Sequence, residues 1–269
     1  MKKMLANLNL PQFNSLEELL SNGFGYSGNI FFSNNEDWSK VLFFFNGAVT
    51  SQKLEISRES AIFQRWSWHK NFRHPIFCIA DPLTYGSDAI PVGWYQGVSN
   101  NKFLIDQISV IKNALALRVD TFKSVAFGSS AGGYAALLSA QLGLVDSVIA
   151  INPQTDILKF FEKNALNAFL NRRNHLGLEA FIDNYSLLNT GFSQLHSLCE
   201  ITYLQNVCDQ SHYSDHMIPY VENLLKSKSM SCLNLLCFKD STLGHNPPDI
   251  DGLSKIIGSP FTSLLKNIK

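Results

Sequence analysis

The hydrophobic residues of this chain gather in short continuous runs that are separated by polar segments. Continuous apolar runs of this length are typical of strands buried on both faces of a sheet, whereas half-exposed strands alternate apolar and polar residues. We therefore predict seven buried or largely buried strands, at residues 29–33, 40–45, 75–80, 125–127, 146–151, 201–207 and 232–238.

Between several of these runs the apolar residues recur at helical spacing. The clearest case is residues 102–119, where the apolar positions recur at near-helical spacing: Phe103, Ile105, Ile108, Ile111, Leu115 and Leu117. Further helices are expected at 16–20, after residue 133, at 215–226 and at about 249–265. Strands that alternate with helices predict an α/β fold, with a mostly parallel central sheet flanked by helices.

The alternation of strands and helices is interrupted at about residues 156–199, where helical patches occur but no strong strand does. We interpret this segment as a helical cap insertion over a site at the sheet edge, within a single domain that spans residues 1–269. Lys159, Arg172 and Arg173 bring positive charge to it, and we predict that they contact substrate phosphates or a carboxylated sugar. A solvated helix face is the alternative interpretation.

Composition narrows the possible partners. The 269 residues are 45% hydrophobic and carry 22 acidic and 22 basic side chains, so the net charge is zero. Neutrality argues against nonspecific attraction to nucleic acid or to an anionic membrane. The five cysteines form no C-x-x-C pair, which favours free thiols in a reducing compartment, and we predict a cytoplasmic protein without a signal peptide or a transmembrane span.

One short stretch carries the strongest chemical signal. Residues 128–132 read Gly-Ser-Ser-Ala-Gly between a predicted strand and a predicted helix, and they fit the G-x-S-x-G pattern with Ser130 at the centre. In such a turn the serine hydroxyl is held above the sheet edge, and the backbone N–H of Ala131 points toward a developing oxyanion. We predict that Ser130 is a nucleophile; a Gly/Ser turn without chemistry is the alternative.

A second oxyanion donor is expected from the end of another strand. The run at residues 40–45 stops abruptly at Asn46, Gly47 and Ala48, and a backbone N–H of Gly47 or Ala48 is the candidate donor. We also assign Asn46 to substrate contact. An ordinary turn is the alternative interpretation of this segment.

A serine nucleophile needs an imidazole to accept its proton and a carboxylate to orient that imidazole. Asp209 follows the strand at 201–207, and His245 follows the last strand, so both are expected at the same sheet edge as Ser130. Asp215 is the reserve acid, and His212 or His216 is the reserve base or a substrate contact.

The acids and histidines near residue 209 also admit a metal site. The pattern D-x-x-H-x-x-D-H, at residues 209–216, places two histidines on one helical face. A third convincing ligand is missing from the pattern, and we predict no metal.

An aromatic pair lies in the loop after the strand at 75–80. Trp94 and Tyr95 are assigned to substrate binding, because aromatic rings beside short polar residues can form the wall of a sugar or acyl pocket. A role in capping the hydrophobic core is the alternative.

The Gly-Ser-Ser-Ala-Gly turn has the form of a nucleophile elbow, a sharp turn between a strand and a helix. With this elbow and with Ser130, Asp209 and His245 in that order, the chain resembles the α/β-hydrolase family from about residue 41 to the C-terminus. The H-G-G-G oxyanion motif of lipases is absent, and Phe-Asn-Gly-Ala stands in its place. This motif, the late Gly-His-Asn-Pro-Pro segment, the small size and the helical insertion are most similar to bacterial capsule O-acetyltransferases.

That resemblance implies transfer of an acetyl group from acetyl-CoA to a hydroxyl of a surface or capsular polysaccharide, through an acyl-serine intermediate. Acetyl-CoA would be the donor, no cofactor would stay bound, and the acceptor would be a carbohydrate or a small molecule. A carboxylesterase or deacetylase that uses water, and a non-catalytic binding protein of the same fold, are the alternatives. The sequence leaves the oligomeric state open.

Overall fold

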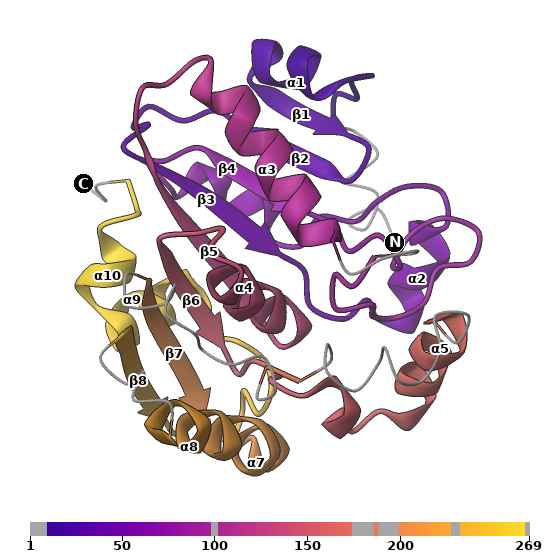
Figure 1. The fold of residues 1–269 in the computed structure, drawn as a ribbon, viewed down its shortest axis with the longest axis vertical. Helices are drawn as coiled ribbons and strands as arrows, with labels where there is room; N and C mark the ends of the chain where they lie inside the picture. The colour runs from indigo at the N-terminus through magenta and orange to yellow at the C-terminus, as the bar shows by residue number, and fades with distance from the viewer. Residues whose placement is uncertain (1–9, 98–101, 174–185, 188–198, 227–231, 267–269) are drawn as a thin grey trace.

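A computed structural model describes residues 10–97, 102–173, 186–187, 199–226 and 232–266 of the chain, and its centre is one eight-stranded sheet (Figure 1). The strand order is β1-β2-β4-β3-β5-β6-β7-β8. The strands are β1 (Phe24–Ser27), β2 (Ile30–Ser33), β3 (Lys40–Phe45), β4 (Ile76–Ile79), β5 (Lys123–Ser129), β6 (Ser147–Ile151), β7 (Glu200–Asn206) and β8 (Leu233–Phe238).

Six neighbouring strands of this sheet, from β4 through β8, run parallel, and β1 and β2 form an antiparallel hairpin at one edge. The predicted α/β class and mostly parallel sheet are therefore confirmed. Because the carboxyl ends of parallel strands meet at one edge, the loops after β3, β5, β6, β7 and β8 converge there.

The hairpin edge has two features that the sequence analysis did not predict. The strands expected at 29–33 and 40–45 exist as β2 and β3, but β4 lies between them and pairs with both. Strand β1 was not predicted, because its four residues, Phe-Gly-Tyr-Ser, form neither an apolar run nor a long alternation.

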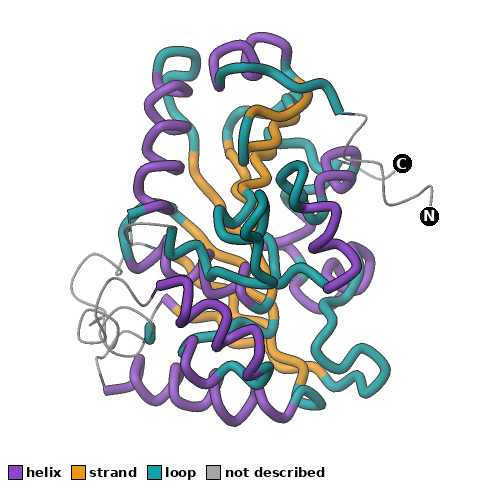
Figure 2. Tube along the Cα trace, turned by 90° about the vertical axis from the view of Figure 1, so that its right-hand side faces the viewer, coloured by secondary structure: helices purple, strands orange, loops and turns teal. Residues whose placement is uncertain are grey.

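Helices cover both faces of the sheet, and Figure 2 shows the strands running between helical and loop layers. The main helices are α1 (Leu16–Asn22), α2 (Ser51–Ser57), α3 (Phe103–Ala116), α4 (Ala131–Gln141), α5 (Lys163–Arg173), α7 (Gln210–His212), α8 (Ile218–Lys226), α9 (Ile250–Ile257) and α10 (Ser259–Thr262). Shorter helical turns are η2 (Trp66–Lys70), η3 (Ile157–Lys159) and η6 (Tyr213–Met217), the last of them π-helical.

Two hydrophobic cores explain why the strands read as continuous apolar runs. Val41, Phe43 and Phe45 of β3 face the core that contains α3, α4 and α8, whereas Leu42 and Phe44 face the core that contains α9 and α10. Successive strand residues point to opposite faces, and both faces of β3 are buried.

Two predicted helices differ in detail. The C-terminal helix expected at 249–265 is divided into α9 and α10 by Gly258, whose φ of 71° is a conformation that favours glycine. The helix expected at 215–226 begins earlier, with α7 and the π-helical η6, before α8. Helix α2 was not predicted.

The segment interpreted as a cap is described only in part. Helix α5 and η3 lie in it, and Asp156 forms an isolated bridge with Ser186. Residues 174–185 and 188–198 lie outside the described part, so the cap stays a prediction.

Two further findings concern the chain as a whole. All five cysteines are free thiols: Cys78, Cys199, Cys208, Cys232 and Cys237. Among the described residues no helix combines the length and the apolar character that a membrane crossing requires.

Candidate active site

Ser130 occupies a strained backbone position between β5 and α4. Its φ of 55° and ψ of −123° lie where side-chain-bearing residues are rarely found. A Cβ atom on Gly128 would lie 2.1 Å from the Gly132 carbonyl oxygen, and one on Gly132 would lie 2.5 Å from the Phe45 carbonyl oxygen. Strand and helix therefore approach too closely for any residue but glycine, as the G-x-S-x-G pattern predicts.

The hydroxyl of Ser130 is held by an amide that the sequence analysis did not single out. Gln154, in the loop after β6, donates from Nε2 to Ser130 Oγ at 3.1 Å and accepts a hydrogen bond from Trp94 Nε1. Within the described part of the chain, Ser130 Oγ and His245 are not hydrogen-bonded to each other. Catalytic hydrogen bonds are often long or unformed before substrate binds.

Asp209 and His245 are brought together as predicted. Nδ1 of His245 lies 2.6 Å from Asp209 Oδ2, so the ring and the carboxylate are hydrogen-bonded. The backbone of the His245 loop is fixed from two neighbouring strand ends: Asn152 donates to the His245 carbonyl at 3.0 Å, and Asn206 donates to the Gly244 carbonyl at 2.8 Å. Asn152 directly follows Ile151, the last residue of β6. The carbonyl of Ile151 accepts a hydrogen bond from the Ser130 N–H, so the end of β6 is bonded both to the nucleophile and, through Asn152, to the His245 loop.

His212 shares the same carboxylate. Its Nδ1 lies 3.1 Å from Asp209 Oδ1, and its ring stacks on the His245 ring with centroids 4.0 Å apart. The side chain of His212 is fully buried, whereas that of His245 is 34% exposed. His245 is therefore the more accessible of the two imidazoles, and the assignment of His212 to substrate contact stays a prediction.

The reserve residues lie elsewhere. Asp215 is exposed, and its carboxylate bonds to the neighbouring Ser214 hydroxyl at 3.1 Å. His216 is buried, and its Nδ1 accepts the Thr155 N–H at 3.2 Å. Neither residue bonds to Asp209 among the described contacts.

The electrostatics of the cluster follow from burial and from these hydrogen bonds. Burial opposes ionisation of Asp209, but the bonds from His212 and His245 outweigh it and hold the pKa of this carboxyl well below its usual range. Burial also lowers the pKa of His212, and it lowers the pKa of His216 to about 3. At pH 7 the carboxyl of Asp209 is therefore ionised, and the buried imidazoles of His212 and His216 are neutral.

The same three side chains offer the one described cluster that resembles a metal site. Ligand atoms of Asp209, His212 and His245 all lie within 4.8 Å of one another. Both imidazoles already direct Nδ1 to the carboxylate, so the geometry is that of a hydrogen-bonded cluster.

The oxyanion donors need one correction. The Gly47 N–H donates to Gln64 Oε1 at 3.0 Å and is therefore occupied, so Gly47 does not supply a free donor. The N–H groups of Ala131 and Ala48 donate no hydrogen bond within the described residues. The loop is close to the serine, because a Cβ on Gly47 would lie 3.9 Å from Ser130 Cβ. Ala131 and Ala48 are the remaining candidate pair.

Asn46, Trp94 and Tyr95 are buried and contact other protein groups, and their assignment to substrate binding stays a prediction. Asn46 accepts the Gln64 N–H at 2.8 Å and donates to the Ile62 carbonyl at 2.5 Å. The Tyr95 hydroxyl donates to the Ile79 carbonyl and accepts the Asn46 N–H. The ring of Trp94 packs between Phe160 and Phe169.

The three cations of the predicted cap do not form a described cluster. Arg172 is paired with Asp88 at 3.1 Å, which accounts for its charge. Lys159 is exposed, and the side chain of Arg173 lies outside the described part.

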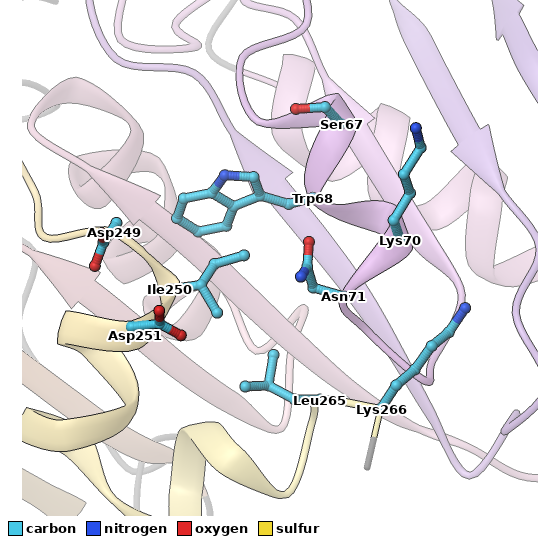
Figure 3. Close-up of a pocket in the computed structure, with 9 residues that line it drawn as sticks. All are labelled: Ser67, Trp68, Lys70, Asn71, Asp249, Ile250, Asp251, Leu265 and Lys266. Atoms are coloured by element: carbon cyan, nitrogen blue, oxygen red, sulfur yellow. The ribbon is translucent and has the colours of Figure 1, made fainter. Parts of the chain in front are cut away.

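A cavity of about 440 Å³ opens on the α9 side of the sheet (Figure 3). Trp68 and Ile250 form its apolar wall, and two lysines and two aspartates line it: Lys70, Lys266, Asp249 and Asp251. The charges balance, and none of the residues that line it is Ser130, Asp209 or His245.

Comparison with known proteins was made on sequence and on structure. No family model matches the sequence, and no curated protein matches it. The capsule O-acetyltransferase of Neisseria meningitidis serogroup A superposes with a TM-score of 0.62 at 15% identity, covering 88% of this chain and 92% of that one. The chain has the α/β-hydrolase fold.

Two more structures share the α/β-hydrolase fold with this chain. Esterase B from Lactobacillus rhamnosis gives a TM-score of 0.59 at 12% identity and covers 87% of this chain and 80% of that one. A variant of the Neisseria enzyme in complex with CoA gives 0.55 at 16% identity, with 81% and 85% covered.

Proposed function

We propose that this protein is a serine-dependent acyltransferase, with Ser130 as nucleophile, His245 as base and Asp209 as the acid that orients it. The supporting observation is the 2.6 Å bond between His245 and Asp209 at the sheet edge where Ser130 sits in a strained elbow. Serine becomes a useful nucleophile at neutral pH only beside such an oriented base.

The proposed first half-reaction acylates the serine. Ser130 Oγ attacks the acyl carbonyl while its proton passes to Nε2 of His245, and the carbonyl oxygen becomes an oxyanion that the Ala131 and Ala48 N–H groups stabilise. The carbon–sulfur or carbon–oxygen bond of the donor then breaks, and His245 returns the proton to the leaving group. Asp209 stabilises the imidazolium formed between these steps.

In the second half-reaction an acceptor hydroxyl gives its proton to His245 and attacks the acyl-serine. A new ester forms, the Ser130 ester bond breaks, and the proton returns to Ser130 Oγ. Water as the acceptor would make the same site an esterase, and the likeness to an esterase keeps that as the second candidate.

We further propose acetyl-CoA as donor and a polysaccharide hydroxyl as acceptor. The support is that the similar Neisseria structure is a capsule O-acetyltransferase and that a variant of it binds CoA. Five free thiols support a reducing compartment such as the cytoplasm.

The test has two parts. The first labels the protein with a fluorophosphonate; labelling of the wild type that is lost in Ser130→Ala supports the nucleophile, and equal labelling of both proteins refutes it. The second follows CoA release from acetyl-CoA with and without added polysaccharide. Release that depends on the polysaccharide supports the transferase, and release that does not favours the esterase.

A further inference from the structure

Arg65 is a cation that has no carboxylate partner in the described part of the chain, and it contacts the residue that precedes the nucleophile. Its Nη2 donates to Ser129 Oγ at 2.7 Å, and Ser129 directly precedes Ser130. None of the ion pairs among the described residues includes Arg65. Ser129 Oγ is the one hydrogen-bond acceptor that the described contacts give this guanidinium.

This placement is energetically unfavourable without an anion. Arg65 is part-buried, and burial lowers the pKa of its guanidinium to about 10. A cation removed from water costs free energy that only a counter-ion or several hydrogen bonds offset. A bound carboxylate or phosphate would supply both.

The guanidinium is also held in one position. Its central carbon lies 5.5 Å from the centroid of the Trp68 ring and 5.8 Å from that of Phe127. The preceding residue, Gln64, makes three hydrogen bonds to the backbone of Gly47 and Ala48. A planar guanidinium that is fixed in this way binds an oxyanion with little further loss of conformational entropy.

The distance between Arg65 and Ser130 indicates which part of the substrate carries the anion. Since consecutive Cα atoms are about 3.8 Å apart, Ser129 Oγ lies within about 9 Å of Ser130 Oγ. Nη2 of Arg65 is 2.7 Å from Ser129 Oγ, so it lies within about 12 Å of Ser130 Oγ. That span matches a charged group on the sugar whose hydroxyl is acylated, whereas the phosphates of CoA are separated from its thioester by the whole pantetheine arm.

We propose that Arg65 forms an anion subsite, which selects acyl acceptors that carry a carboxylate or phosphate near the acylated hydroxyl. The proposal rests on the acyltransferase function proposed above. The chain is neutral overall, and the cavity in Figure 3 is lined by as many aspartates as lysines, so this selectivity is local to Arg65.

The test uses matched pairs of sugars. p-Nitrophenyl acetate acylates the protein, nitrophenolate release reports that step, and acetylated sugar is compared with free acetate. Methyl glucuronide is paired with methyl glucoside, and glucose 1-phosphate with glucose, so that the two pairs distinguish carboxylate from phosphate. Binding of the same sugars is measured by NMR saturation transfer, which requires no turnover.

We expect the wild type to prefer the anionic member of at least one pair by about tenfold or more, the effect of a charge-assisted hydrogen bond. Arg65→Gln should abolish the preference, and Arg65→Lys should retain part of it. Ser129→Ala, which removes the protein partner but leaves the cation, should keep it. Equal use and binding of both members by the wild type, or a preference that persists in Arg65→Gln, would overturn the proposal.

Failure of the acyltransferase function gives a different result. Nitrophenolate release that does not depend on Ser130 would contradict that function, while the binding comparison would still decide the role of Arg65.

Discussion

His212 stacks on His245 at a centroid distance of 4.0 Å, and both rings donate to the carboxylate of Asp209. One carboxylate thus serves two imidazoles, of which only His245 is accessible. We infer that His212 is a positioning residue: it fixes the rotation of Asp209 and shares its negative charge.

If His212 is a positioning residue, two of its variants should differ in activity. His212→Asn retains an N–H near the position of Nδ1 but removes the stacked ring, whereas His212→Phe retains a ring and removes the hydrogen bond. With the bond lost, Asp209 is no longer fixed beside His245, so kcat should fall more in His212→Phe than in His212→Asn, with KM little changed in both. Equal kcat values for the two variants would show that His212 only fills space.

Gln154 should support the chemistry through the hydrogen bond that it donates to Ser130 Oγ. Gln154→Glu has nearly the same shape and can still accept from Trp94, but it replaces the donor with a negative charge. We expect kcat with p-nitrophenyl acetate to fall by about 10² or more, as when an oxyanion donor is removed. Trp94→Phe, which removes only the Trp94 N–H, should have a smaller effect; the reverse order would contradict this role.

The elbow glycines should be required for folding. Gly128→Ala places a Cβ 2.1 Å from the Gly132 carbonyl oxygen, so strand and helix must separate, and we expect a loss of about 3 kcal/mol in the free energy of unfolding measured in urea. Gly47→Ala is the matched control, because its nearest described contact would be 3.4 Å, and its effect should stay below about 1 kcal/mol. Similar losses in both variants would disprove the close-packed elbow.

Acidification should destabilise the protein through His216. Its pKa is lowered to about 3 by burial, against about 6.5 in the unfolded chain. Between these values the unfolded state binds more protons, so stability falls as the pH decreases from about 6.5, by up to about 1.4 kcal/mol per pH unit. The depressed pKa of Asp209 adds a further loss below about pH 4.

Urea unfolding at a series of pH values measures this dependence. His216→Gln should reduce the slope between pH 4 and 6.5, and Asp215→Asn, which alters an exposed carboxylate of the same helical turn, should leave it unchanged. A slope unaffected by His216→Gln would place the acid sensitivity elsewhere.

The features that local sequence predicts best are those with local causes. The elbow follows from two glycines at fixed spacing, and β3 and β6 follow from uninterrupted apolar runs. Asp209 and His245 could be predicted because strand ends in a parallel sheet share one edge.

Other long-range side-chain contacts could not be predicted. The bond from Arg65 to Ser129 spans 64 residues, and no local pattern around Gln154 or Gln64 reveals what they bond to. Trp94 and Tyr95 were ambiguous because aromatic residues in loops line pockets or fill cores, and only packing distinguishes the two. The position of β4 between β2 and β3 is likewise a matter of non-local pairing.

Strand β8 is partly exposed and, among the described strands, pairs only with β7 at the end of the sheet. The loop that follows it carries His245. Ser130, by contrast, follows β5, which is flanked by β3 and β6. Fraying at the open edge would therefore displace the proton acceptor while the nucleophile stays in place. Under mild denaturation, turnover should disappear before the bulk of the sheet melts.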